Sequence, residues 1–278
     1  MVYLPIFGAL LEATGMSLEK NLLKKTRLNY KSYTVYGFLA IVLVMLPFIY
    51  FLWSIKPEAF YKKNLFLFFL VVFVSTLANL FTFFSIKRED LSVLEPVRLF
   101  QPLFTVVLAV LLYKSEREYT IFALAMIASI SLIFPYFKRH HLSFNKYIVS
   151  GLLGSFFFAL ELVISKSILN YYNLFTFYFL RCLFIFLITL VAFRPKIKIK
   201  SKTKLIIILI ASIWVIYRII LYYGYQIYGI VFTTTLLLLT PVFVFLFAKI
   251  FLKEEIQLKH IISSAIIVIC VVLAIILE

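Results

Sequence analysis

The chain alternates between long apolar stretches and short polar or basic segments. Each apolar stretch is close to the roughly 20 residues that an α-helix needs to cross a bilayer. We place ten such spans at about 3–20, 33–54, 64–86, 91–113, 119–137, 147–170, 172–193, 203–224, 228–252 and 258–277. They are too long and too continuously apolar for the strands of a membrane barrel, so the pattern predicts ten transmembrane helices.

Composition supports the same fold class. Hydrophobic residues make up 64% of the 278 residues, and the mean hydropathy is +1.06. A soluble core of this size could not hide so much apolar surface, and ten spans with short loops leave no room for a soluble domain. The chain is therefore predicted to be an all-α, multi-pass protein of the cell membrane, either inner or plasma membrane.

The net charge of +16 does not indicate a nucleic-acid partner, because most basic residues lie in short loops between the spans. Lysine and arginine at such positions determine topology and contact lipid headgroups. The loops that follow odd-numbered spans hold 18 of them, whereas those that follow even-numbered spans hold 5. The positive-inside rule then places the odd-numbered loops in the cytoplasm and both termini outside.

One stretch of the chain occurs twice. The segment from Leu91 to Thr120 aligns without a gap on the segment from Ile230 to Lys259, 139 residues later. The aligned pairs include Pro102 with Pro241, Phe104 with Phe243, Lys114 with Lys253 and Glu116 with Glu255. Because the offset is half the chain length, the sequence predicts two homologous halves.

Each half holds five spans, so the second half enters the membrane from the opposite side. The chain is therefore predicted to form two inverted five-helix repeats, residues 1–139 and 140–278, related by a pseudo-two-fold axis in the membrane plane. Such repeats suit alternating access, because an exchange of conformation between the halves converts an inward-open state into an outward-open one.

The two proline-containing segments resemble the EamA-like domain of the drug/metabolite transporter superfamily. The matching residues are Pro102-Leu103-Phe104 through Lys114-Ser115-Glu116, and Pro241-Val242-Phe243 through Lys253-Glu254-Glu255. An arginine early in the second span of a half is also common in that family, as at Arg181. The resemblance implies a ten-helix bundle with a central cavity and secondary transport of small organic solutes. The family is generally drawn with cytoplasmic termini, the opposite of what the loop charges predict.

Charged residues inside spans are the candidate site. A charge there costs at least ~2.5–3.5 kcal/mol, so it should face a cavity or a partner. Arg181 and Arg218 have no acidic neighbour nearby in the sequence, and we expect them to face a central cavity and bind an anionic group of the solute. Asn79 aligns with Arg218 in the repeat, and Trp214 and Tyr222 flank Arg218 as aromatic walls.

Four further charges are part of the same prediction. Glu95 and Arg98 are three residues apart on one helix face, so they either bind the solute or neutralise each other. Glu12 and Glu161 are candidates for the group that couples transport to a proton or ion. Each of these glutamates is also a competing partner for the two arginines.

The aligned prolines and glutamates allow two interpretations each. Pro102 and Pro241 remove a backbone hydrogen bond and predict either a hinge or a static kink. Glu116 and Glu255 stand at span boundaries, where each either forms a gate or places negative charge at the start of the next helix.

The function that these features favour is secondary transport of a small organic metabolite or drug by alternating access. No nucleophile–base arrangement or glycine-rich phosphate loop indicates an enzyme. His140, His141 and His260 lack an accompanying Cys or Asp cluster, so no metal or cofactor is expected. The alternative is a flippase for a lipid-linked substrate such as a polyprenyl phosphate, in which the arginines would pair with phosphate. The expected partners are an anionic or zwitterionic solute and membrane lipids, with the protein a monomer or homodimer.

Overall fold

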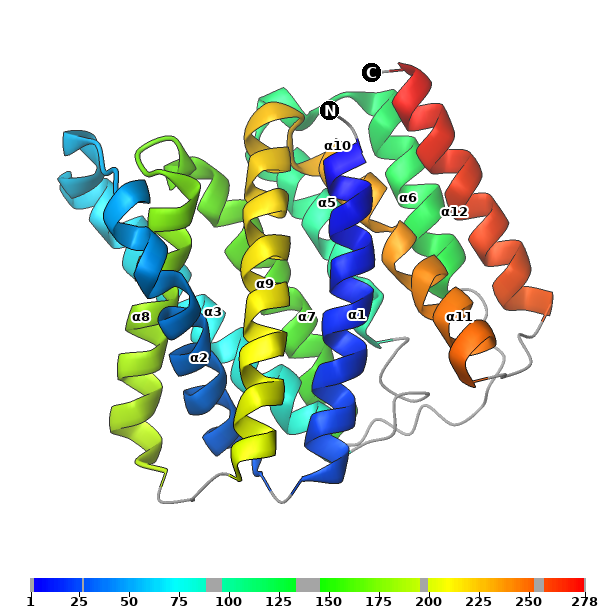
Figure 1. Cartoon of the computed structure of the whole chain (residues 1–278). Helices are drawn as coiled ribbons and strands as arrows, with labels where there is room; N and C mark the ends of the chain where they lie inside the picture. Colours follow the sequence, from blue (N-terminus) through cyan, green and yellow to red (C-terminus); the bar gives the residue numbers. More distant parts are fainter. Residues whose placement is uncertain are drawn as a thin grey trace.

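The computed structural model describes residues 3–26, 28–88, 97–133, 146–195, 200–252 and 258–277. The helices pack lengthwise in one bundle (Figure 1). Their bounds are α1 (Tyr3–Lys25), α2 (Tyr30–Leu52), α3 (Lys62–Arg88), α5 (Phe100–Leu112), α6 (Tyr119–Ile133), α7 (Lys146–Leu169), α8 (Leu174–Phe193), α9 (Ser201–Ile227), α10 (Ile230–Leu237), α11 (Leu239–Leu252) and α12 (Leu258–Leu277), with 3-10 turns η1 (Pro57–Phe60) and η2 (Lys114–Glu116).

Within the described residues, six helices are long and apolar enough to cross a membrane: α2, α3, α7, α8, α9 and α12. Helices α5 and α6 and the α10–α11 segment are shorter apolar helices. Large hydrophobic side chains are exposed along most of these helices, as a lipid-facing surface requires. The chain is a multi-pass membrane protein.

The helix bounds keep the offset of the sequence repeat. Helices α3 and α9 begin and end 139 residues apart, and α5 with α11 and α6 with α12 begin at that same spacing. Helix α1 runs away from the end at which both termini lie, whereas α7 runs toward it (Figure 1). The two halves are therefore inverted. The predicted boundary at residue 139 falls between residues 134 and 145, outside the described residues.

The packing between halves follows the same symmetry. Helix α3 packs along α7 as α9 packs along α1, and α2 pairs with α8 as α6 pairs with α12. Two glycines at the repeat spacing support these contacts. A Cβ added to Gly15 would stand 3.3 Å from Ile213, and one added to Gly154 would stand 2.4 Å from the hydroxyl of Thr82. The absence of a side chain lets α1 and α9, and α7 and α3, approach closely.

A helix break precedes each of the two aligned prolines. The chain leaves regular helix at Leu99 (φ −65°, ψ −13°) and at Leu238 (φ −62°, ψ −9°). Pro102 and Pro241 are each the third residue of the helix that follows. The missing N–H of proline costs little there, because the first turn of a helix has no intrahelical partner for it. Each proline therefore lies in the first turn after a local irregularity, at which the backbone stays right-handed helical.

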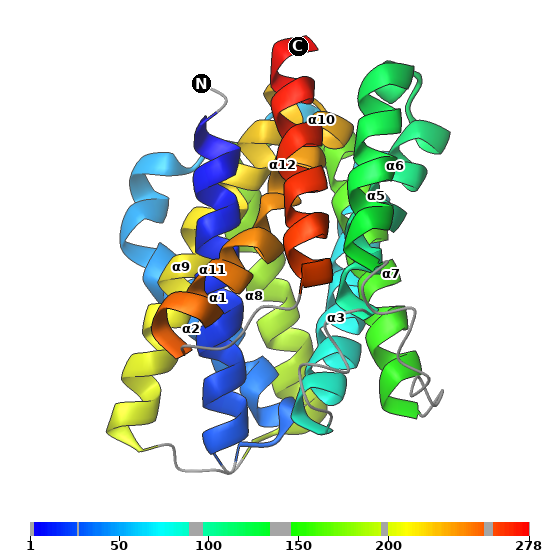
Figure 2. The same ribbon diagram turned by 90° about the vertical axis from the view of Figure 1, so that its right-hand side faces the viewer.

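The two ends of the bundle differ. The terminal end carries both chain termini, and at the basic end α1 and α8 end and α2 and α9 begin (Figures 1 and 2). At the terminal end the loops of the two halves are hydrogen-bonded: Lys56 N–H donates to Tyr171 O (2.8 Å) and Asn173 N–H to Ser54 O (2.9 Å). At the basic end, residues 28–29, 194–195 and 200 make no backbone hydrogen bond to a described residue of the other half.

Candidate functional site

A pocket lies between the halves, with an empty volume of about 680 Å³ that includes space open to solvent. Glu19, Tyr33 and Ile207 line it near the basic-end termini of their helices, whereas Arg181 and Arg218 line it further inside. The pocket therefore extends from the interior of the bundle toward the basic end.

Two arginines share one buried carboxylate at the inner end of this pocket. Arg181 Nη1 donates to Glu161 Oε1, and Arg218 Nη1 donates to Glu161 Oε2 at 3.2 Å. The Tyr222 hydroxyl donates to Glu161 Oε1 at 3.1 Å and lies 2.7 Å from Arg181 Nη1. Glu161 is 0% exposed. We refer to Arg181, Arg218 and Glu161 as the arginine cluster.

The arginine cluster carries one net positive charge, since two guanidiniums face a single carboxylate. Aromatic rings contribute further to holding it: Arg181 lies 4.9 Å from the ring centre of Tyr178 and Arg218 5.8 Å from that of Phe158. Cation–π contacts of this kind stabilise a desolvated cation without neutralising it. The inner end of the pocket therefore stays electropositive.

Three helices build the cluster. Glu161 comes from α7, Arg181 from α8 and Arg218 from α9. On α7, Ser165 lies one turn after Glu161 and donates to its backbone carbonyl at 2.7 Å. The acidic partner of the arginines thus comes from a different helix than either arginine. The sequence shows no acidic residue close to Arg181 or Arg218, so it could not identify this partner.

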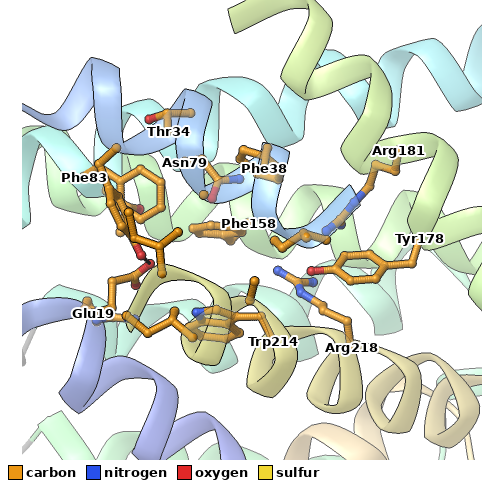
Figure 3. A pocket seen from close by; sticks show the side chains of 18 residues that line it. Glu19, Thr34, Phe38, Asn79, Phe83, Phe158, Tyr178, Arg181, Trp214 and Arg218 are labelled. Carbon is orange, nitrogen blue, oxygen red and sulfur yellow. Dashed lines mark hydrogen bonds between the residues drawn. The ribbon is translucent and has the colours of Figure 1, made fainter. Parts of the chain in front are cut away.

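The structure brings most of the predicted binding residues together. Arg181, Arg218, Asn79, Trp214 and Arg98 all line the pocket (Figure 3). Tyr222 does not line it and is 0% exposed, so it lies behind the arginines as their hydrogen-bond partner. Glu95 lies outside the described residues, and its pairing with Arg98 stays a prediction.

Sequence reasoning missed several residues of the pocket wall. Glu19, Phe158 and Tyr178 line it and were not predicted to do so. Glu19 had a signal, because it shares a helix face with Gly8 and Gly15, the face that packs on α9. Phe158 and Tyr178 are two aromatics among many, and nothing local distinguishes them.

A second pocket of about 590 Å³ surrounds the two helix breaks. Pro102, Pro241 and Glu12 line it, and Arg98 lines this pocket as well as the first. Glu12 accepts a hydrogen bond from the Thr240 hydroxyl at 2.9 Å. Glu12 therefore does not pair with Arg181 or Arg218, and both aligned prolines lie beside it.

Glu116 occupies an unexpected position at the terminal end. Its carboxylate accepts the backbone N–H groups of Ile230 and Val231, each at 2.9 Å, and pairs with Lys166. The interpretation that Glu116 opens the next helix in the chain is therefore wrong: it caps α10, in the other half. Gly229, just before α10, has φ +87°. Glu255, the aligned residue, lies outside the described residues.

The model of the EamA-like transporter family matches residues 2–137 and 145–276, one match in each half. The chain belongs to the EamA-like transporter family. It also resembles a solved structure described as "Crystal structure of protein", with a TM-score of 0.73 at 14% identity, covering 100% of this chain and 98% of the other. At that identity the likeness shows the fold alone. No curated protein matches the chain.

Membership of the EamA-like family makes this protein a membrane transporter of small solutes. The family consists of transporters rather than enzymes. Its two matched segments coincide with the two halves that the helix bounds and the inverted packing define.

Proposed function

We propose that this EamA-like protein is a secondary transporter that moves a small organic solute with an anionic group across the membrane by alternating access. The pocket on the basic side of the arginine cluster is the solute site. The observation that carries the proposal is the buried pair of arginines around one carboxylate at its inner end.

A net positive charge in a low-dielectric interior is costly unless something compensates it. An anionic solute supplies that compensation, and a guanidinium offers donors that match a carboxylate or phosphate. Arg181 Nε is buried and has no hydrogen-bond partner within the described part of the chain. Arg218 lines the pocket with its side chain 10% exposed, against 2% for Arg181. Arg218 is therefore the first contact for the solute.

The contrast between the ends supports alternating access. Hydrogen bonds join the halves at the terminal end, whereas the described loops at the basic end lack such bonds. Inverted repeats can exchange these two arrangements, so that the same site faces one side and then the other. On the loop-charge prediction the basic end is cytoplasmic.

Glu161 and Glu12 are the candidate coupling groups. Glu161 competes directly with an anionic solute for both arginines, so its protonation would free the guanidiniums for the solute. Glu12 lines a separate pocket and is bonded to a neutral hydroxyl, which leaves its charge available to a proton or cation.

The test is solute uptake by purified protein in vesicles, with short-chain carboxylates as substrates. Arg218→Gln keeps hydrogen-bonding capacity and removes the charge that meets the solute. Lys204→Gln, an exposed position on the same helix α9, is the matched control. We expect Arg218→Gln to lose at least tenfold in carboxylate uptake and the control to retain it. A folded Arg218→Gln protein with unchanged uptake would reject the proposal.

The alternative function, flipping of a lipid-linked substrate, would use the same arginines and is tested in a separate experiment. The same vesicles are loaded with a fluorescent polyprenyl phosphate, and its movement between leaflets is measured. Protein-dependent, Arg218-dependent movement of this lipid, without uptake of any water-soluble carboxylate, would favour the flippase.

A further inference from the structure

The first pocket has a second charged end, opposite the arginine cluster. Glu19 lines it there and is 6% exposed. Its Oε1 accepts a hydrogen bond from the Tyr33 hydroxyl at 2.7 Å. Within the described residues Glu19 forms no ion pair, although the positive charge of Arg98, which lines the same pocket, acts on it electrostatically.

The two charged ends are well separated along the helices. Gly15 contacts Ile213 and Trp214, and Glu19 lies one turn further along α1 toward the basic end. Because α1 and α9 run in opposite directions (Figure 1), one turn further along α1 corresponds to one turn back along α9 from Ile213 and Trp214, which is near Ile210. Arg218 is eight residues beyond Ile210, which corresponds to about 12 Å along the axis at about 1.5 Å per residue.

The wall between these ends is aromatic. Trp214 and Phe158 lie between Glu19 on one side and Arg218 with Arg181 on the other (Figure 3). Aromatic side chains of this kind bury the apolar body of a ligand, while a few polar groups fix its orientation. The pocket thus offers a carboxylate, then an apolar section, then guanidiniums.

The polarity is a property of this sequence and does not follow from the repeat. The 139-residue shift pairs Glu19 with Phe158, and Arg218 with Asn79. All four residues line the same pocket. Positions that the repeat makes equivalent therefore carry different side-chain chemistry. In each pair only one of the two residues is charged.

We propose that the pocket takes an elongated dipolar solute, with its anionic group at Arg218, its apolar body against Trp214 and Phe158, and its cationic group at Glu19. This rests on the proposed transport function and narrows its substrate class. A free α-amino acid carries both charges on one carbon and cannot reach both ends. An ω-amino acid or a short peptide, with charges at opposite ends, can.

Arg98 is the competing partner for Glu19, because it lines the same pocket. It acts on Glu19 electrostatically but forms no ion pair with it in this structure, so the carboxylate has no direct cationic contact and remains available to a ligand. If Glu19 served only to balance Arg98, its removal would weaken or strengthen the binding of every anion alike and would not distinguish ligands by their amine.

Three compounds with one six-carbon chain test the proposal: 6-aminohexanoate, 2-aminohexanoate and hexanoate. Binding to purified protein in lipid nanodiscs is measured calorimetrically for wild type, Glu19→Gln and the exposed control Glu58→Gln. We expect wild type and the control to bind 6-aminohexanoate at least tenfold more tightly than the other two. Glu19→Gln should lose that preference and keep its affinity for hexanoate.

A preference that survives Glu19→Gln, or three compounds that bind equally or not at all to wild type, would overturn the proposal. If Arg218→Gln loses the binding of hexanoate, the anion site at Arg218 is still supported. If Arg218→Gln binds hexanoate as wild type does, the transport proposal itself is rejected. If Glu19→Gln does not fold, the proposal is tested by the binding of the three compounds to wild type and to Glu19→Asp, which keeps the charge.

Discussion

The terminal end and the basic end of the bundle consist of elements that the repeat makes equivalent, yet the halves are joined differently at each. At the terminal end, the α2–α3 loop is hydrogen-bonded to the α7–α8 loop, and Glu116 of the first half caps α10 of the second. At the basic end the described loop residues make no backbone bonds between the halves. A repeated sequence therefore does not imply repeated contacts, and the difference is of the kind that the proposed alternating-access cycle requires.

The largest expected effect comes from removing the Glu116 carboxylate. Glu116→Ala leaves two N–H groups of α10 and the ammonium of Lys166 without their acceptor. Breaking a buried pair of this kind costs on the order of 3 kcal/mol. Thermal unfolding in detergent should show the loss, and Glu118→Ala, an exposed neighbour, should show none. Equal melting temperatures for the two variants would contradict the role given to Glu116.

A smaller loss is expected from Gly229→Ala. Gly229 has φ +87°, and an added Cβ would stand 2.9 Å from Glu116 Oε1. With φ +87° and ψ 171° the backbone lies in a region that essentially only glycine adopts, which costs an alanine about 1–3 kcal/mol. The same unfolding assay measures it, with Gly37→Ala as the control, since a Cβ there meets nothing closer than 4.0 Å.

Removal of a single bridging hydroxyl should cost less again. Thr176 Oγ1 donates to Leu52 O at 2.9 Å and accepts the Ser54 N–H at 3.1 Å, which joins α8 to the end of α2. Thr176→Val keeps the shape and loses both bonds, for a loss of about 1–2 kcal/mol. Hydrogen exchange at the Ser54 amide should rise in this variant. Unchanged protection would show that the bond contributes nothing to closing the terminal end.

The smallest effect belongs to the basic end. Lys200 is exposed and makes no side-chain cap to α9, so Lys200→Ala should change stability by no more than about 0.5 kcal/mol. A loss as large as that of Thr176→Val would mean that the basic end is also held closed, and the comparison between the ends would fail.

Much of the fold was predictable because a bilayer imposes helix length and apolar composition. The predicted spans 64–86 and 258–277 correspond closely to α3 and α12. The predicted span 228–252 appears as two helices separated at Leu238, although Pro241 marked the position. The sequence located the proline but did not decide between a kink and a break, which depends on the neighbours that satisfy the freed carbonyls.

The site was predictable in its members and less so in its pairings. Burial cost alone selected Arg181 and Arg218, and the repeat selected Asn79. The choice of Glu161 over Glu12 as the shared partner depends on how three helices are rotated about their axes, which spacing along one helix does not fix. One of the two interpretations of Glu116 was wrong because a helix start lay three residues away, whereas the two N–H groups that its carboxylate accepts lie more than 110 residues further along the chain.

Arg98 has one more consequence. Within the described residues it alone lines both pockets, so one side chain borders both spaces. A side chain changes rotamer within nanoseconds, whereas helices and loops rearrange over microseconds to milliseconds. A change in the rotamer of Arg98 would therefore alter the shape and charge of both pockets at once, without the movement of any helix.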